Sequence, residues 1–522
     1  MKQYLIIILA CILPFAAWSQ SNYWQQEVNS TISARLDEVK KQITGFESIE
    51  YINNSPDTLN QIYIHIWPNA YRDQNTALAR QLKEQTTSEE NITINLKGWI
   101  DDLDFKQDGE KIKTVRQPNI DILLLKLNSP LLPGMKTVLS TPFTVQLPPY
   151  FSRSGYTKDQ IIACQWYPKP AVYDKKGWHQ FPYLDQGEFY GEFGSFDVTL
   201  DLPQEYVVGA TGMLQNQEEL DRYRIIGDSN FKYLNSPVFL PYPSLQGRKQ
   251  LQFKADSVHD FAWFAGKNIV IEHDTAVINN RTIDLFVFKR NKQDKSWSRA
   301  IEFGKGAIHY YSDRIGPYPY PVIQIVEGPS NYSSGGMEYP MITLITSPES
   351  TIPFLDGVIT HEVGHNWFYG ILATNERTHP WMDEGLNSYF QFWYEANKYR
   401  YNSYIGSLLP TNITDLQLDD FLDRIYGALN RLVAKQAIET SSENFSNKDA
   451  YGTVIYVKTA VWCYLLEKSL GKSVLDRAFK AYFERWKFKH PYPDDFKAIV
   501  EEVSGKNVDE LFKLLKKRGN FR

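Results

Sequence analysis

Two histidines lie four residues apart in the segment His361-Glu362-Val363-Gly364-His365. On an α-helix, side chains at this spacing share one face, so both imidazoles can bind one metal ion. Neutral imidazoles in this arrangement suit tetrahedral Zn²⁺, and Glu362 can reach a water on that ion without being a ligand itself. The alternative interpretation is a helix that carries two histidines and no metal.

Glu384 is the candidate third ligand. It lies 19 positions after His365, and Trp381-Met382-Asp383-Glu384-Gly385 opens the next apolar helical pattern. The intervening length allows one helix to end, a loop to reverse the chain and a second helix to bring Glu384 beside the histidines. Two histidines and one carboxylate leave one coordination position open, which is typical of a catalytic zinc site. For Glu384 alone, the alternative is an acid favoured by the dipole at a helix N-terminus.

Helical periodicity dominates the part of the chain that contains these residues. The pattern predicts helices over residues 301–315, 358–369, 387–399 and 454–470, with short strands at 323–326 and 342–345. We therefore expect residues 273–522 to form a mixed α/β domain in which helices dominate.

Strand patterns dominate the preceding part. Residues 62–66, 121–127, 196–202 and 206–212 are rich in β-formers or alternate in polarity, and turn residues separate them. Residues 21–41 are predicted to be partly helical. Because strands and turns continue to about residue 272, we expect an antiparallel β domain over residues 20–272 and an α+β multidomain chain as a whole.

The N-terminus predicts a signal peptide. Lys2 precedes a mostly apolar run from Tyr4 to Trp18, which is too short for a comfortable membrane span. Small residues near its end predict cleavage after residues 1–19, with Gln20 as the new N-terminus. We expect an exported protein, periplasmic or secreted, with no membrane attachment after cleavage. A lipoprotein signal at Cys11 is the alternative.

Composition excludes several classes of protein. The chain has 522 residues, of which 43% are hydrophobic and 22% charged, and this excludes a disordered chain, a collagen and a coiled coil. The net charge of -5 gives no basic excess, so nucleic acid is not an expected partner. Three cysteines exclude a disulfide scaffold, and the sequence does not decide whether Cys164 and Cys463 pair.

The metal motif, with its glutamate 19 residues on, is similar to that of the gluzincin metallopeptidases. Upstream, Gly335-Gly336-Met337-Glu338-Tyr339-Pro340 resembles the G-x-M-E-N exopeptidase motif of the M1 zinc aminopeptidases. Residues 196–212 and 260–263 also resemble the N-terminal β domain of that family. The resemblance covers nearly the whole mature chain and implies a thermolysin-like catalytic domain, in a short form without the helical C-terminal domain of many members.

The resemblance implies a role for each matching residue. His361, His365 and Glu384 match the ligands of one Zn²⁺ per chain, and Glu362 matches the general base. Glu338 matches the glutamate that holds the α-amine of the substrate, beside Gly335, Gly336 and Met337.

Two further assignments rest on weaker matches. Tyr456-Val457-Lys458 resembles the family's Y-x-K-G segment, which makes Tyr456 the expected oxyanion stabiliser, although Thr459 replaces the glycine. Gln165, in Cys164-Gln165-Trp166-Tyr167-Pro168, resembles a glutamine of the N-terminal domain that lines the amine site. An ordinary polar strand residue is the alternative for Gln165. Tyr339 and Gln391 stand where the family usually has an asparagine and often an acid.

Together these expectations describe a zinc-dependent aminopeptidase that removes N-terminal residues from peptides by attack of a zinc-bound water. A carboxylate at Glu338 would hold the charged α-amine so that only the first peptide bond reaches the metal. The alternatives are a zinc endopeptidase, which shares the metal site only, and a non-catalytic peptide-binding protein on the same fold. The preferred N-terminal residue, the physiological substrate and the oligomeric state are not fixed by the sequence.

Overall fold

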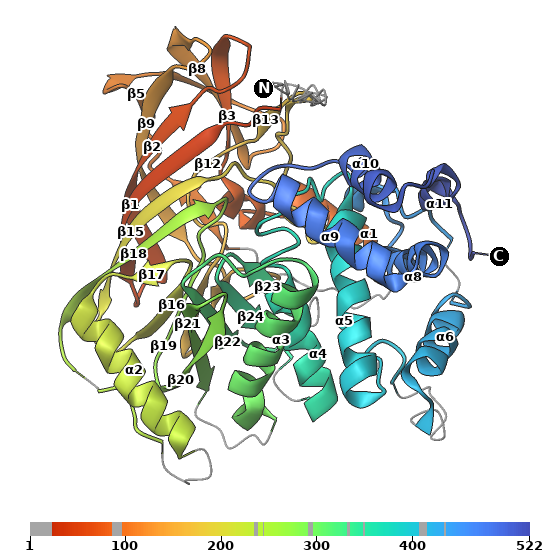
Figure 1. The fold of residues 1–522 in the computed structure, drawn as a ribbon. Helices are drawn as coiled ribbons and strands as arrows, with labels where there is room; N and C mark the ends of the chain where they lie inside the picture. Colours follow the sequence, from red (N-terminus) through yellow and green to blue (C-terminus); the bar gives the residue numbers. More distant parts are fainter. Residues whose placement is uncertain are drawn as a thin grey trace, which may run out of the picture.

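The computed structural model describes residues 23–85, 97–233, 239–243, 245–290, 296–330, 335–347, 350–406, 415–432 and 435–521. The predicted signal peptide, residues 1–19, lies outside the described residues, so its cleavage stays a prediction. Figure 1 shows the β-rich N-terminal part (red to yellow) on one side, the C-terminal helices (blue) on the other, and a smaller sheet with its helices (green) between them.

A large sheet forms much of the N-terminal part. In spatial order its strands are β17 (Met213–Leu214), β18 (Arg248–Val258), β15 (Gly194–Pro203), β1 (Glu27–Asp37), β2 (Gln42–Ile52), β9 (Lys136–Gln146), β5 (Lys106–Gln107) and β6 (Glu110–Lys111), with β4 (Trp99–Asp101) also paired to β9. β1 lies parallel to β15, whereas β1–β2, β2–β9 and β15–β18 are antiparallel. The sheet is therefore mixed, and the expected antiparallel domain needs this correction.

β1 occupies a segment that was predicted to be partly helical. Alternate side chains from Val28 to Leu36 are buried, the two-residue period of a half-buried strand. The helix prediction is wrong here because β1 gains a partner strand on each side, β2 and β15, and such distant pairing overrides local propensity.

Smaller sheets complete the N-terminal part. Their strands, in spatial order, are β10 (Gly155–Tyr156), β11 (Gln160–Ala163), β19 (Trp263–Gly266) and β16 (Val207–Ala210); then β12 (Lys169–Pro170), β3 (Leu59–His65), β8 (Ile122–Leu131) and β7 (Lys113–Arg116); and the pair β13 (Tyr173–Asp174) and β14 (Gly177–Trp178). The strands predicted at 62–66, 121–127, 196–202 and 206–212 are confirmed as β3, β8, β15 and β16. Two helices within this part, α1 (Ala77–Gln85) and α2 (Gln217–Lys232), were not predicted.

The sheet of the C-terminal part begins at Ile269. Its strands are β20 (Ile269–Ile278), β21 (Arg281–Arg290), β22 (Val322–Glu327), β24 (Ile342–Ile345) and β23 (Gly336–Tyr339), in that spatial order. β21, β22 and β24 are parallel, and β23 joins antiparallel at the edge. The domain boundary predicted at residue 272 falls inside β20, so the change of sheet comes slightly earlier. The strands predicted at 323–326 and 342–345 are confirmed as β22 and β24.

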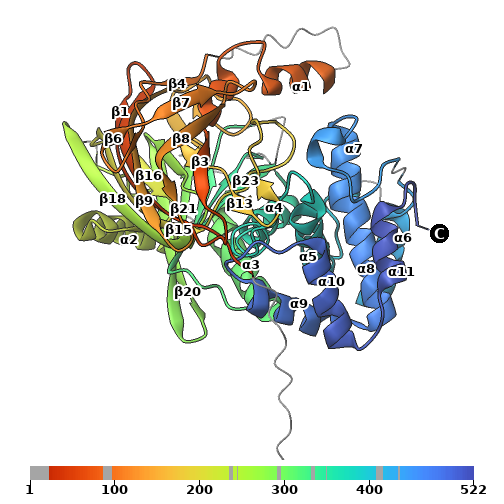
Figure 2. The ribbon, with the colours of Figure 1, turned by 90° about the horizontal axis from the view of Figure 1, so that it is seen from above.

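Helices pack against this sheet and extend beyond it. They are α3 (Ala300–Arg314), α4 (Ile352–Gly364), α5 (Glu384–Tyr399), α6 (Leu418–Leu429), α7 (Lys448–Tyr451), the π-helical segment η7 (Gly452–Lys458), α8 (Thr459–Leu470), α9 (Lys472–Trp486), α10 (Pro493–Ser504) and α11 (Asp509–Lys513). Seen from above, α6 and α8 to α11 gather on the side of the molecule opposite the large sheet (Figure 2). The helices predicted at 301–315, 387–399 and 454–470 are confirmed, whereas α4 begins earlier and ends earlier than predicted.

Cys164 and Cys463 do not pair, and both are buried as free thiols. Among the described residues, none of the helices combines the length and the apolar character that crossing a membrane requires.

Candidate metal centre and active-site cavity

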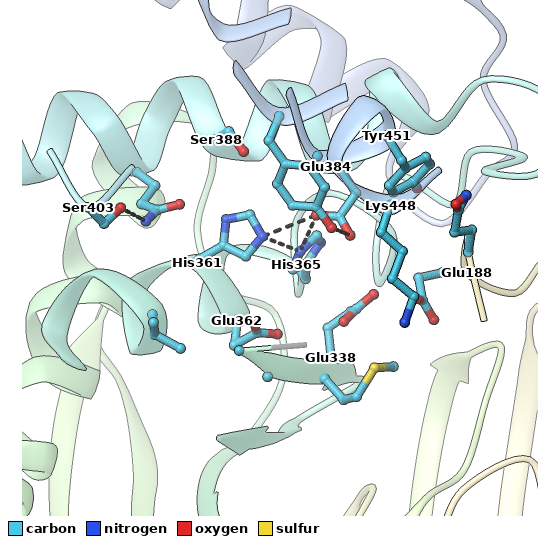
Figure 3. Close-up of a pocket in the computed structure, with 18 of the residues that line it drawn as sticks. Glu188, Glu338, His361, Glu362, His365, Glu384, Ser388, Ser403, Lys448 and Tyr451 are labelled. Carbon is cyan, nitrogen blue, oxygen red and sulfur yellow. Dashed lines mark hydrogen bonds and ion pairs between the residues drawn. The ribbon is translucent and has the colours of Figure 1, made fainter. Parts of the chain in front are cut away.

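Three side chains converge where α4 ends and α5 begins (Figure 3). Nε2 of His361 lies 3.0 Å from Nε2 of His365, and the two nitrogens lie 3.1 and 3.2 Å from Oε2 of Glu384. All three side chains are buried. Two atoms that each bind a tetrahedral zinc at about 2.0 Å lie roughly 3.3 Å apart, so this ligand trio fits one such ion. The structure thus brings the three predicted ligands together.

A close helix crossing sets the position of this ligand trio. A Cβ on Gly364 would lie 2.2 Å from Oδ1 of Asn387 and 2.3 Å from the hydroxyl of Tyr311, so only glycine allows α4 to approach α5 this closely. Asn387 donates a hydrogen bond to the carbonyl oxygen of His361 at 2.8 Å and accepts one from Tyr311 at 2.5 Å. These bonds hold the last turn of α4 against the first turn of α5.

Two neighbours orient the ligands. Nδ1 of His365 lies 2.7 Å from Oδ1 of Asp383, a contact that assigns the ring proton to Nδ1 and leaves Nε2 as the metal-binding atom. The Tyr456 hydroxyl donates to Oε1 of Glu384 at 2.6 Å, which leaves Oε2 facing the histidines. Tyr456 lies on the π-helical turn η7, a geometry that recurs at functional sites. Gly385 makes room for Thr459, since a Cβ there would lie 2.4 Å from that side chain.

Glu362 faces a cavity of about 410 Å³ beside the ligand trio. Its Oε2 is buried and has no hydrogen-bond partner among the described residues. A Cβ on Gly336 would lie 2.4 Å from Cδ of Glu362, whereas the nearest atom to a Cβ on Gly335 would be 3.6 Å away. Gly336 is therefore the glycine of the pair that the Glu362 side chain requires. Burial raises the pKa of the Glu362 carboxyl to about 8.

Glu338 enters the same cavity from the edge strand β23 (Figure 3). One of its carboxylate oxygens lies within 4.8 Å of a ring nitrogen of His365. Its Oε1 is buried without a hydrogen-bond partner among the described residues. Burial raises the pKa of Glu338 well above its usual range, and the neighbouring carboxyls of Glu188, Glu384 and Glu362 raise it further. Among the described residues Glu338 forms no ion pair, and a cation bound in the cavity would supply a partner for its Oε1.

The N-terminal part supplies one wall of the cavity, through residues other than the predicted Gln165. Glu188 lines this wall and is held by Arg153, whose Nε lies 3.1 and 2.8 Å from the two carboxylate oxygens. Gly187, at a φ of +78°, carries the loop close to the C-terminal part, because a Cβ there would lie 2.3 Å from Oγ of Ser442. Short acidic loops around a glycine are common in sequences. Only the packing of the N-terminal part against the C-terminal part therefore identifies this loop as a wall of the cavity.

Gln165 lies outside this cavity. Its Nε2 donates to Oδ2 of Asp260 at 2.5 Å, and its Oε1 accepts from Nζ of Lys169 at 2.8 Å. Lys169 and Asp260 themselves form a buried ion pair at 2.6 Å. The structure therefore does not bring Gln165 to the candidate amine site, and the alternative of an ordinary buried polar residue describes it.

The two departures from the family pattern have different outcomes. Tyr339 is buried on the face of β23 opposite Glu338, with its ring 6.3 Å from that of Phe264, so this replacement does not line the cavity. Gln391 does line the cavity. Its Nε2 donates to Oε1 of Glu395 at 2.8 Å and to Oγ of Ser403 at 3.0 Å, so an acid follows one helical turn later.

Comparison with known proteins shows which proteins this chain is similar to. Residues 299–514 match the Peptidase family M1 domain. Aminopeptidase M1-C of Oryza sativa subsp. japonica is 26% identical over 225 residues, which are 41% of this chain and 24% of that protein. Aminopeptidase M1-D of the same plant is 24% identical over 354 residues, which are 65% of this chain and 36% of that protein. The chain thus spans well under half the length of these curated relatives.

Solved structures share the fold at low identity. The M1 zinc metallopeptidase from Deinococcus radiodurans superposes with a TM-score of 0.61 at 12% identity, over 95% of each chain. Aminopeptidase A of Legionella pneumophila superposes with a TM-score of 0.64 at 14% identity, over 96% of this chain and 50% of the other. The domain match covers α3 to α11, including the ligand trio. Residues 299–514, which contain the ligand trio, are therefore similar to the Peptidase family M1 domain.

Proposed function

We propose that this protein is a zinc-dependent aminopeptidase that releases N-terminal residues from peptides with a free α-amine. The observation that carries the proposal is the position of the Glu338 carboxyl, which lies in one cavity with Glu362 and within 4.8 Å of a ring nitrogen of His365. A carboxyl group at this distance from the ligand trio leaves room for about one residue between a bound amine and the metal.

The residues of the cavity supply the acid–base chemistry of hydrolysis. Zn²⁺ held by His361, His365 and Glu384 would act as a Lewis acid that activates water and polarises the scissile carbonyl. Glu362 accepts a proton from the attacking water and delivers it to the leaving nitrogen. The Tyr456 hydroxyl lines the cavity and donates to Glu384 as folded; during turnover it would transfer this hydrogen bond to the carbonyl oxygen as that oxygen becomes negative, a contribution of about 10²–10³ in rate.

The amine site makes the enzyme an exopeptidase in this proposal. A free α-amine is mostly cationic at pH 7 and forms a charge-assisted hydrogen bond with a carboxylate. Glu338 offers that carboxylate without a competing hydrogen bond at its Oε1 among the described residues. Relatives named aminopeptidases support this assignment, and a variant of the Deinococcus radiodurans enzyme has been crystallised with a Tyr-Ser-Ala substrate.

The test is a panel of aminoacyl reporters on the wild type and on Glu362→Gln, with the zinc content of both measured. We expect zinc to be retained in both proteins and turnover to fall by about 10²–10⁴-fold in the variant. Zinc bound at one equivalent with no turnover of any reporter by the wild type would contradict the proposal and favour a non-catalytic peptide-binding protein.

Blocked substrates separate an aminopeptidase from an endopeptidase. We expect N-acetylated peptides to be cleaved far more slowly than the same peptides with a free amine, because the acetyl group removes the charge that Glu338 binds. Equal rates on both would favour the endopeptidase.

We also propose that the protein is exported to the periplasm or the medium. The support is the apolar run from Tyr4 to Trp18 behind Lys2, which lies outside the described residues. Mass spectrometry of protein purified from fractionated cells should find Gln20 as the N-terminal residue in the exported fraction. Intact Met1 in a cytoplasmic fraction would contradict it.

A further inference from the structure

An ion pair joins the two parts of the molecule across one end of the cavity. Asp185 belongs to the loop between β14 and β15, and Lys448 begins α7. Nζ of Lys448 contacts Oδ2 of Asp185, and both side chains line the cavity. The Lys448 side chain is 41% exposed, whereas that of Asp185 is only 1% exposed. The cation is therefore on the solvent side of the pair, and the carboxylate is fixed behind it.

The mobility of the two partners differs for structural reasons. Oδ1 of Asp185 accepts a hydrogen bond from Ser152 at 2.8 Å, and its backbone N–H donates to Oε1 of Gln81 at 2.8 Å. Lys448 reaches the pair through a flexible four-carbon chain. The other cation of this wall, Arg153, is committed to Glu188 and to the carbonyl oxygen of Leu184. Of these two cations among the described residues, Lys448 is thus the one whose own charge stays in contact with solvent when it moves, and its movement exposes the carboxylate of Asp185 to another cation.

In the proposed function, this end of the cavity would receive the side chain of the substrate's N-terminal residue. In Figure 3, Ser388 and Ser403 lie on one side of the ligand trio, and Glu338, Glu188 and Lys448 lie on the other. A peptide with its amine at Glu338 and its first carbonyl at the metal continues toward the serines. Its first side chain therefore projects toward the wall that contains Asp185 and Lys448.

We propose that Asp185 and Lys448 set the charge preference for the N-terminal residue, with Lys448 occupying a carboxylate that would otherwise bind an N-terminal lysine or arginine side chain. The inference rests on the proposed aminopeptidase function and names its substrate class: peptides that begin with a neutral residue. A neutral side chain leaves the pair intact. A basic side chain must displace the tethered ammonium, and an acidic one meets the carboxylates of Asp185, Glu188 and Glu338.

Single substitutions of the pair should shift the preference in opposite directions. Lys448→Met leaves Asp185 uncompensated, so the ratio of kcat/KM for an arginyl reporter to that for a leucyl reporter should rise about tenfold, which corresponds to about 1.4 kcal/mol. Asp185→Asn leaves Lys448 without its partner, so the ratio of a glutamyl reporter to the leucyl reporter should rise and the arginyl ratio should not. Most of the change should be in KM, because the pair contacts a part of the substrate that does not react.

Two control variants test whether charge is the cause. Lys448→Arg keeps a cation opposite Asp185 and should keep the wild-type ratios. Lys468→Met removes a lysine from an exposed pair with Asp423, at 2.9 Å and away from the cavity, and should leave all ratios unchanged. Thermal melts of each variant show whether it is folded before kinetics are compared.

The failure of this inference is distinct from the failure of the proposed function. Turnover by folded Lys448→Met with an arginyl-to-leucyl ratio within twofold of the wild type would overturn the charge assignment and leave the aminopeptidase intact. A wild type that prefers arginyl over leucyl reporters would also overturn it. The absence of turnover with every reporter would instead contradict the proposed function itself.

Discussion

Two buried polar clusters in this molecule balance their charges in opposite ways. In the paired cluster of Gln165, Lys169 and Asp260, each charged group has a partner: Lys169 and Asp260 lie 2.6 Å apart, and Gln165 bonds to both. The cavity acids, Glu338 and Glu362, each keep a buried carboxylate oxygen without a hydrogen bond among the described residues. Both clusters are buried, so burial alone does not distinguish them.

The pKa shifts follow the difference in pairing. Burial by itself raises the pKa of Asp260, but Lys169, together with His259 and Gln165, outweighs that effect and holds this pKa below its usual range. Burial raises the pKa of both cavity acids, and neighbouring carboxyls add to it. The paired cluster is complete as folded, whereas the cavity acids lie where a metal and a substrate amine would supply the missing positive charge. Buried polar residues that lack partners are thus the better indicators of function here.

The largest expected effect comes from breaking the paired cluster. Lys169→Met leaves the carboxylate of Asp260 buried and uncompensated, and removing one partner of a buried ion pair typically costs about 3–5 kcal/mol of unfolding free energy. Urea denaturation of the purified variant checks the value. In the fraction that stays folded, kcat/KM should remain close to that of the wild type, because Lys169 does not line the cavity.

A matched control uses an exposed pair. Lys136 and Glu50 lie 2.6 Å apart, with the lysine side chain 65% exposed, and Lys136→Met should destabilise the protein far less than Lys169→Met because water screens an exposed pair. Equal destabilisation by the two substitutions would show that the buried pair contributes no more than a surface one and would remove the contrast between the clusters.

These two clusters also show how far the sequence could predict the site. The spacing of His361 and His365 is local to one helix, so the sequence alone predicts that they share a face, and the structure brings Glu384 to them. Gln165 is different, because a polar residue between strands can face either way. In the structure its backbone has a positive φ of 52°, and its side chain bonds to Asp260 rather than lining the cavity.

Residues of the cavity wall were beyond the reach of sequence patterns for a related reason. Asp185, Glu188 and Lys448 lie in a loop and at the start of a short helix, and they meet only because the N-terminal and C-terminal parts pack together. The same limit explains β1 and the mixed sheet, since its parallel pairing with β15 joins residues far apart in the chain. Short-range periodicity in the sequence predicts most of the helices and strands. Which of their residues line the cavity depends on long-range packing, which the periodicity does not contain.

Glu395, a buried acid near the cavity, should make the stability of the protein depend on pH. Burial raises the pKa of Glu395 from 4.5 to about 7, against the bonds from Gln391 and Ser403. The folded protein then keeps this proton up to about pH 7, whereas the unfolded chain loses it near pH 4.5. The free energy of unfolding should therefore decrease as pH rises from 4.5 to 7, by at most about 3 kcal/mol from this group. Denaturant titrations at pH 5 and pH 8 should show a larger decrease in the wild type than in Glu395→Gln, in which the raised pKa values of Glu338 and Glu362 still contribute; equal decreases in both would contradict it.

The cavity acids should respond to substitution in the opposite sense to Lys169. Glu338→Gln replaces a buried carboxyl that lacks a cation, so the protein should be no less stable than the wild type. Its kcat/KM for free-amine reporters should fall about 10²-fold, or about 2.7 kcal/mol, because the charge-assisted bond to the amine is lost. Tyr339→Phe changes the next residue on the same strand but on the opposite face, and should leave kcat/KM within about twofold. If Glu338→Gln loses stability but keeps the wild-type kcat/KM, Glu338 has a structural role like that of the paired cluster.

The smallest effect that we expect comes from substituting Gln165. This substitution is also the sharpest test of whether the paired cluster is structural and the cavity acids are functional. Gln165→Met removes the hydrogen bonds to Asp260 and Lys169 but leaves their ion pair in place, so we expect a loss of about 1–2 kcal/mol of unfolding free energy. Since the side chain lies outside the cavity, kcat/KM for free-amine reporters should stay within about twofold of the wild type. A kinetic loss as large as that of Glu338→Gln would mean that Gln165 reaches the bound amine during turnover. The paired cluster would then belong to the amine site. Whether a buried polar residue has all its partners would no longer tell a structural residue from a functional one in this protein.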